Sequence, residues 1–183
     1  MQKNFNLLIS CARFHEKDAI AEIWYLFSNI NDDEVKGEQT IFPGLVIAKT
    51  NQNPIESVKK LRIFIKNDPL YMRFVLKVVP IEVIVETCLE NIIKIVKKFE
   101  ARITKTETFR ITVKSRFSPL NSQNLIIKAA EFIDRKVNLT KPDLILRLEI
   151  LGSVTGISLL RPMDILSKAE FTQPPDLPKR DKC

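Results

Sequence analysis

Residues 108–116, with the sequence TFRITVKSR, alternate apolar and polar side chains. Because the side chains of a strand point alternately to its two faces, this pattern predicts a strand with Phe109, Ile111 and Val113 on one face. The other face can stay in water, where its cations repel one another at this spacing. These cations are Arg110, Lys114 and Arg116. The strand therefore favours an anionic partner.

The predicted strand begins a longer pattern of elements. A loop follows it, then a helix over residues 122–137, then strands over residues 144–151 and 153–160. If the apolar side of the helix packs inward, its basic residues and those of the next loop can converge with the strand cations. These basic residues are Lys128, Arg135, Lys136 and Lys141. Such a cluster would suit the phosphates of a nucleic acid.

The first 80 residues show a different order of elements. Asn53 can cap a helix, and Pro54 suits the first helical position that follows it. Apolar runs and alternation around this helix predict the order β-α-β-β-α-β, which is that of a ferredoxin-like unit. The expected strands are 5–11, 35–41, 45–49 and 72–79, and the expected helices are 17–30 and 53–66.

These patterns predict an α+β fold, like an α/β sandwich, with helices packed on small sheets. Residues 1–80 would form the ferredoxin-like domain. Residues 81–166, which include a further helix over 87–101, would form a second domain. Residues 167–183 contain three prolines and few apolar side chains, so we expect a disordered tail there.

The composition argues against an enzyme. His15 is the only histidine, so neither a Ser-His-Asp triad nor a multi-histidine metal site can be built. The four glycines form no phosphate-binding loop, and no pair of carboxylates is marked as a general acid and base. We therefore expect no catalysis, no cofactor and no metal. The net charge of +7 favours nucleic acid or another anionic surface as the partner.

The cysteines and the hydropathy pattern bear on the compartment. Cys11, Cys88 and Cys183 are far apart and form no metal-binding or disulfide framework, which favours a reducing cytoplasm. No apolar run is long enough to span a bilayer, so no membrane association is expected. Phe117, at the entry of the loop after the predicted strand, could stack on an unpaired base, although a lone aromatic more often anchors a loop.

The stretch 108–160 resembles the THUMP domain, a tRNA-binding module found in several RNA-modifying systems. The resemblance is carried by the strand FRITVKSR, the helix ending in IDRKVNLTKPD, the leucine-rich strand after it and the closing GISLL strand. The helix over 87–101 and the ferredoxin-like unit match the larger arrangement of this family, so the likeness covers about residues 1–165. It implies binding of the acceptor region of tRNA, in particular its single-stranded 3′ end.

The chain shows no catalytic motif after its THUMP-like part, which makes it similar to stand-alone members of the family. That likeness implies a non-catalytic adaptor for a separate enzyme, a tRNA cytidine acetyltransferase that makes N4-acetylcytidine. Two alternatives stay open: a protein-interaction module with incidental RNA binding, or the RNA-recognition subunit of a thiolation or methylation system. The expected RNA-binding residues are Arg110, Lys114, Arg116, Lys136, Lys141, Arg73, Lys77 and Arg13.

Overall fold

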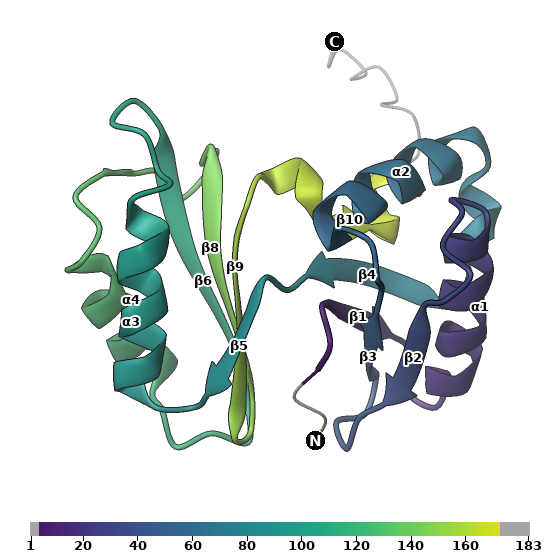
Figure 1. Cartoon of the computed structure of the whole chain (residues 1–183), viewed down its shortest axis with the longest axis horizontal. Coiled ribbons are helices and arrows are strands. Elements are labelled where there is room, and N and C mark those ends of the chain that lie inside the picture. Colours follow the sequence, from purple (N-terminus) through teal and green to yellow (C-terminus); the bar gives the residue numbers. More distant parts are fainter. Residues whose placement is uncertain (1–3, 173–183) are drawn as a thin grey trace, which may run out of the picture.

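The computed structural model describes residues 4–172. It contains two five-stranded sheets that pack face to face, and helices cover the outer side of each sheet (Figure 1). The first sheet, sheet A, has the strand order β10-β4-β1-β3-β2, and all of its neighbouring strands are antiparallel. Strands β1 to β4 have the order and connections of a ferredoxin-like unit, as predicted. The elements of this part are β1 (Leu7–Cys11), α1 (Glu16–Ser28), β2 (Lys36–Gln39), β3 (Leu45–Lys49), α2 (Pro54–Asn67), η1 (Pro69–Tyr71) and β4 (Val75–Pro80).

The second sheet, sheet B, has the order β5-β9-β8-β6-β7, in which β6 is parallel to both of its neighbours. The two sheets and their helices confirm the α+β fold class. The elements of this part are β5 (Val83–Glu86), α3 (Leu89–Glu100), β6 (Thr108–Arg116), α4 (Ser122–Ala130), β7 (Lys136–Val137), β8 (Leu144–Leu151) and β9 (Val154–Leu160). Whether the two layers are separate domains stays a prediction.

The sheets pack against each other because their central strands are apolar on both faces. In β1, Leu7 packs beneath the helices of sheet A, whereas its neighbour Leu8 belongs to a core shared with sheet B. In β8, Leu146 packs against the helices of sheet B and Ile145 enters the shared core. Burial of apolar surface from water drives this contact. The shared core also contains Leu45, Ile47, Val79, Leu151, Val154 and Leu160.

A glycine permits the close approach of the chain that links the two sheets. A Cβ at Gly156, in β9, would lie 3.0 Å from Cγ2 of Ile81, which follows β4. Ile81 is itself buried in the shared core. A larger residue at position 156 would therefore crowd the side chain of Ile81, which would have to shift by a few tenths of an ångström.

The chain returns from sheet B to sheet A, and this corrects the expected start of the tail. The expectation placed disorder from residue 167, but the described residues after 160 form η2 (Pro162–Asp164), β10 (Leu166–Ser167) and η3 (Lys168–Glu170). β10 pairs with β4, and Leu166 is buried in the core beneath α1 and α2. A single buried leucine and a two-residue strand are too short to show as a pattern in the sequence. Residues 173–183 lie outside the described residues.

Arg62 of α2 holds this returning segment in place. Its guanidinium donates to the backbone oxygen of Met163 over 2.9 Å and to that of Ile165 over 2.7 Å, and it pairs with Glu170. A planar guanidinium suits several acceptors at once, because its five N–H groups point in fixed directions. The contact fastens the end of the second layer to a helix of the first.

A cationic cleft between the two sheets

A cleft of about 550 Å³ opens where the facing surfaces of the two sheets diverge. Its walls come from β1 and β4 of sheet A, from β6 and β8 of sheet B, and from the returning segment that ends at Thr172. Among residues 4–172, five cations and one carboxylate line it, which leaves four positive charges in excess. The cations are Lys77, Lys114, Arg116, Arg147 and Lys168, and the carboxylate is that of Glu149.

The strand register explains why these side chains meet. In the parallel pair of β6 and β8, Thr112 lies opposite Arg147 and Lys114 lies opposite Glu149. Residues paired in this way point to the same face of the sheet. That face also bears the apolar residues of the shared core, so the polar part of the face lies at the rim of the contact between the sheets.

Glu149 organises the arginines of the cleft. Its side chain is 2% exposed, and its Oε1 accepts from Arg147 Nε over 2.7 Å and from Arg147 Nη2 over 2.6 Å. Its Oε2 accepts from Arg116 Nη1 over 3.3 Å. A buried carboxylate is tolerated only when it is paired and hydrogen-bonded in this way. The glutamate therefore fixes two guanidinium groups at the wall of the cleft and balances one of their two charges.

The lysines of the cleft differ in whether their ammonium groups already have a partner in the protein. Lys168 donates from Nζ to the backbone oxygen of Arg73 over 2.7 Å, which ties η3 to the segment before β4. Within residues 4–172, no carboxylate lies within 4.0 Å of the ammonium group of Lys77 or of Lys114. These two ammonium groups come from opposite walls, one from sheet A and one from sheet B. Both can therefore bind a phosphate of a ligand in the cleft.

Of the eight predicted RNA-binding residues, the structure brings three into the cleft: Lys77, Lys114 and Arg116. Arg110 lies on the same strand face but is not part of the cleft wall. Its Nη1 donates to the backbone oxygen of Leu139 over 2.8 Å, so Arg110 holds the loop before β8. The expectation that the polar face of β6 is fully wet is therefore wrong, since the Nε of Arg110 and the Oγ1 of Thr112 are buried.

The other four predicted residues are exposed and lie outside the cleft wall. Lys136 is on β7 at the edge of sheet B, and Lys141 is in the loop that follows. Arg73 places its guanidinium 5.3 Å from the ring centre of Phe74, and only its backbone reaches the cleft lysine Lys168. Arg13 follows β1 and lies beside the hairpin between β2 and β3. Their roles in binding RNA stay predictions.

The expected convergence of helix and strand cations does not occur. The predicted helix over 122–137 ends at Ala130, and the turn after it leads into β7, where Val137 is exposed. α4 packs its Leu125 and Ala129 against the face of sheet B that is opposite to the cleft. Lys128, on α4, is therefore separated from Lys114 by the sheet itself.

Two cations of the cleft were missed by the sequence reasoning. Arg147 could have been found, because the alternation in β8 places it and Glu149 on one face, and the parallel register with β6 follows from the strand-helix-strand order. Lys168 carried no such signal. It lies in a segment with no apolar period, and only the pairing of β10 with β4 brings it to the cleft.

An aromatic side chain projects next to the β6 end of the cleft. Phe117 directly follows Arg116 and is 87% exposed, with a positive φ of 51°. Its ring lies 6.0 Å from that of Phe42, which is buried in the shared core. A bulky residue in the left-handed region is uncommon, and such residues gather at binding sites. Phe117 thus points toward solvent, and its ring lies beside the buried ring of Phe42.

The hairpin that supports this aromatic pair is fastened to α1. The backbone N–H of Gly44 donates to Oε1 of Glu16 over 2.6 Å, and this bond lowers the pKa of the Glu16 carboxyl. Gly44 has a φ of 74°, and a Cβ there would lie 2.9 Å from the backbone oxygen of Cys11. Only glycine fits this turn without strain. The hairpin is consequently a fixed support for Phe42.

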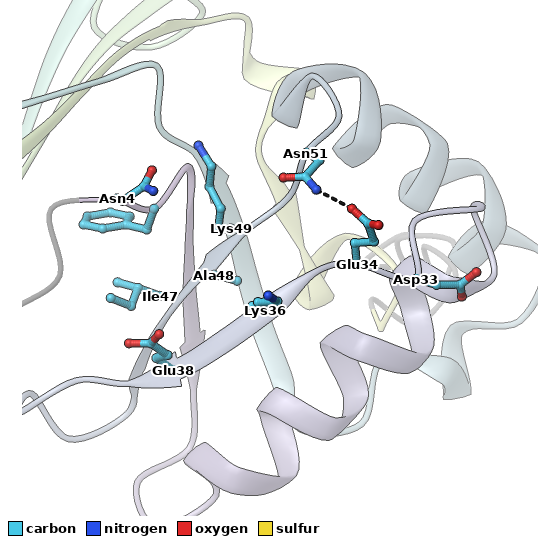
Figure 2. A pocket seen from close by; sticks show the side chains of 10 residues that line it. Asn4, Asp33, Glu34, Lys36, Glu38, Ile47, Ala48, Lys49 and Asn51 are labelled. Carbon is cyan, nitrogen blue, oxygen red and sulfur yellow. Dashed lines mark hydrogen bonds between the residues drawn. The ribbon is translucent and has the colours of Figure 1, made fainter.

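A second hollow, of about 660 Å³, lies beside β2 and β3, and three carboxylates and two lysines of the described residues line it (Figure 2). The Nδ2 of Asn51 donates there to the carboxylate of Glu34. The hollow is thus less suited to a polyanion than the cleft. The charged residues around it are Asp33, Glu34, Lys36, Glu38 and Lys49.

Clusters of metal ligands and membrane-spanning helices are both absent from residues 4–172. Between residues 4 and 172, no group of three or more histidine, cysteine or acidic side chains is placed to hold a metal ion. In the same range, no helix is long and apolar enough to cross a membrane.

Comparison with known proteins identifies the second layer. The family model of the THUMP domain matches residues 86–160, which run from the end of β5 to the end of β9. This part of the chain is therefore a THUMP domain, as the resemblance implied. A THUMP domain implies RNA binding in tRNA modification. No curated protein matches the sequence.

Solved structures share the fold of both layers. The chain is similar to PH1313 from Pyrococcus horikoshii, with 19% identity and a TM-score of 0.56 over 86% of this chain and 55% of that one. TrmN from Thermus thermophilus gives 13% identity and a TM-score of 0.56 over 86% and 46% of the two chains. A 4-thiouridine synthetase in complex with RNA and ATP gives 13% identity and a TM-score of 0.53 over 90% of this chain and 42% of that one. The chain thus spans about half the length of these proteins.

Proposed function

We propose that this chain binds tRNA in the cleft between its sheets and presents the tRNA to a separate modifying enzyme, without catalysing the modification itself. The proposal rests on one observation above all: four cations from the two sheets and Lys168 of η3 line the cleft, and one carboxylate of the described residues opposes them. Neutralising phosphates and releasing their counterions gives most of the affinity of proteins for nucleic acids. A cleft with this charge therefore suits an RNA backbone.

The chemistry of the cleft supports an adaptor better than an enzyme. Its carboxylate, Glu149, is the only acidic group that residues 4–172 contribute to the wall, and two arginines engage both of its oxygens. A general base must be free to accept a proton from the substrate, and a carboxylate in this setting is not. The proposed role is therefore to hold and orient RNA in the cytoplasm for a partner that carries the reactive groups.

We infer that the partner is a cytidine N4-acetyltransferase, on the resemblance to the stand-alone adaptors of that enzyme. The test is a reconstituted reaction with purified acetyltransferase, tRNA and acetyl donor, with and without this chain. We expect the chain alone to transfer no acetyl group and to raise the rate of acetylation by about tenfold or more, because it lowers the entropic cost of positioning the tRNA. Unchanged acetylation, together with stimulation of a thiolation or methylation enzyme, would instead favour the alternative modification systems.

The exposed ring of Phe117 leads to a second prediction, on the part of the tRNA that binds. Because the ring stands at the end of the cleft, we expect it to stack on an unpaired base of the acceptor end. Stacking on an aromatic side chain is worth about 1–3 kcal/mol per base. Phe117→Ala should thus weaken binding of intact tRNA by about tenfold, as measured by filter binding.

The controls for this prediction use both the RNA and the protein. A tRNA trimmed of its unpaired 3′ nucleotides should bind the wild type more weakly than intact tRNA and should no longer distinguish wild type from Phe117→Ala. Ile63→Ala, which removes an exposed apolar side chain from α2, should leave binding unchanged. Equal affinity of wild type for intact and trimmed tRNA would contradict a contact with the 3′ end.

A further inference from the structure

Residues of α3, of α4 and of the turn after α4 line a groove. Figure 1 shows both helices on the outer side of sheet B, which faces away from sheet A. The volume of the groove is about 450 Å³, and its floor is formed by Leu89 and Ile93 of α3 and by Phe132, which follows α4. A smaller hollow of about 270 Å³ shares Leu89 and Lys128 with the groove and reaches the start of α4. The groove and this hollow together follow the whole of α4.

The apolar floor is open rather than sealed. Phe132 is 38% exposed, and the ammonium group of Lys97 lies 4.3 Å from the centre of its ring. α4 has nine residues and is therefore about 13 Å long, which matches two to three turns of a partner helix. Grooves of this kind, between two helices with an apolar floor, accept the apolar face of an amphipathic helix.

Lysines stand on both banks of the groove. Lys94 and Lys97 belong to α3, and Lys128 belongs to α4. No carboxylate of the described residues lies within 4.0 Å of any of the three ammonium groups. Glu90 and Glu131 also line the groove, so the positive charges are in excess by one and are unpaired on both sides. A helix that binds between these lysines has the highest affinity if both of its flanks carry carboxylates.

We propose that this groove docks an acidic amphipathic helix of a partner protein. The inference rests on the proposed function, because an adaptor needs a docking surface that leaves its RNA cleft free. The groove meets that need, since sheet B separates it from the cleft. An RNA backbone would use the lysines but would gain nothing from the apolar floor, whereas an amphipathic helix uses both.

The test selects the ligand by its chemistry. A displayed library of random peptides, each about four helical turns long, is selected on the full chain and counter-selected on a groove variant, Lys94→Glu/Lys97→Glu/Lys128→Glu. We expect the survivors to carry apolar residues at helical spacing with glutamate or aspartate on both flanks. Their affinity for the groove variant should be at least about tenfold weaker, because three rim contacts become repulsive.

Two matched controls separate the groove from the rest of the helices. Lys98→Glu reverses a charge on α3 that does not line the groove, and it should leave peptide affinity within about twofold. Phe132→Ala should weaken the peptides by about tenfold, because truncation of a buried aromatic anchor costs most in such contacts. Ile127→Ala, which removes a side chain of α4 that is 52% exposed but does not line the groove, should not.

Binding of tRNA is measured on the same variants. If the groove variant binds tRNA as the wild type does and loses the peptides, the proposal stands. Peptides without acidic flanks, peptides that bind the groove variant equally well, or a loss of tRNA affinity in the groove variant would each overturn it. If the wild type binds no tRNA, the proposed function fails while the peptide result is still decided by these variants alone.

Discussion

Replacing Lys77 and Lys114 together by alanine is expected to weaken tRNA binding by roughly 25- to 60-fold at about 0.1 M salt. The two ammonium groups stand on opposite walls of the cleft and have no carboxylate partner among residues 4–172. Each phosphate contact contributes about 0.7–0.9 to the slope of log K against log salt concentration, so the magnitude of the slope should fall by about 1.4 to 1.8. A salt titration by filter binding measures both quantities.

The matched control removes the same charge elsewhere. Lys136→Ala/Lys141→Ala changes two exposed lysines near the edge of sheet B, outside the cleft. We expect a much smaller loss for this variant, because these residues were predicted from the sequence but do not reach the cleft wall. If the control variant loses as much affinity as the cleft variant, the RNA-binding surface includes the β7 edge of sheet B. That result would contradict the proposal that the cleft is the RNA-binding site.

Glu149→Gln is expected to lower the free energy of unfolding by about 3 kcal/mol. The substitution keeps the size of the side chain but removes the charge that two arginines share, and it places an amide N–H₂ where a carboxylate oxygen accepted hydrogen bonds. Breaking a buried ion pair from one side costs about 3–5 kcal/mol, because the remaining charge stays buried without compensation. Urea denaturation followed by circular dichroism gives the value.

Two observations would count against this account of Glu149. One is a change below about 0.5 kcal/mol, which is the range of ordinary surface substitutions. Glu131→Gln, on the exposed side of sheet B, provides that reference in the same chain. The other is a loss of tRNA affinity in the folded fraction of Glu149→Gln. The variant makes the cleft more positive, so its folded molecules should bind tRNA at least as well as the wild type.

The order of elements was accessible to sequence reasoning because local chemistry sets it. Asn53 caps α2, accepting from the backbone N–H groups of Ile55 and Glu56, and Pro54 occupies the first helical position, as predicted. The alternation over residues 108–116 gave β6 with its bounds unchanged. These signals act between residues close in sequence, so their spacing alone carries them.

The candidate site was only partly accessible for the opposite reason. Lys77, Lys114 and Arg116 were predicted to bind RNA from charge and alternation, but nothing local showed that the first lies across a cleft from the other two. The length of α4 was overestimated, because the apolar residues Ile133 and Val137 continue a helical spacing that the turn after Ala130 breaks. Tertiary pairing of β7 with β6 overrode that local pattern.

The sequence by itself therefore determined the α+β class, the ferredoxin-like order of the first layer and a positively charged strand, since each depends on periodicity and composition. The THUMP-like character of the second layer came from its resemblance to a known family. The tertiary structure alone decided which charges act together. It placed Glu149 between two arginines, brought Lys168 back beside β4, and turned Arg110 away to a backbone oxygen. The physical reason is that these contacts join residues far apart in sequence, and packing of two sheets that are apolar on both faces fixes their distances.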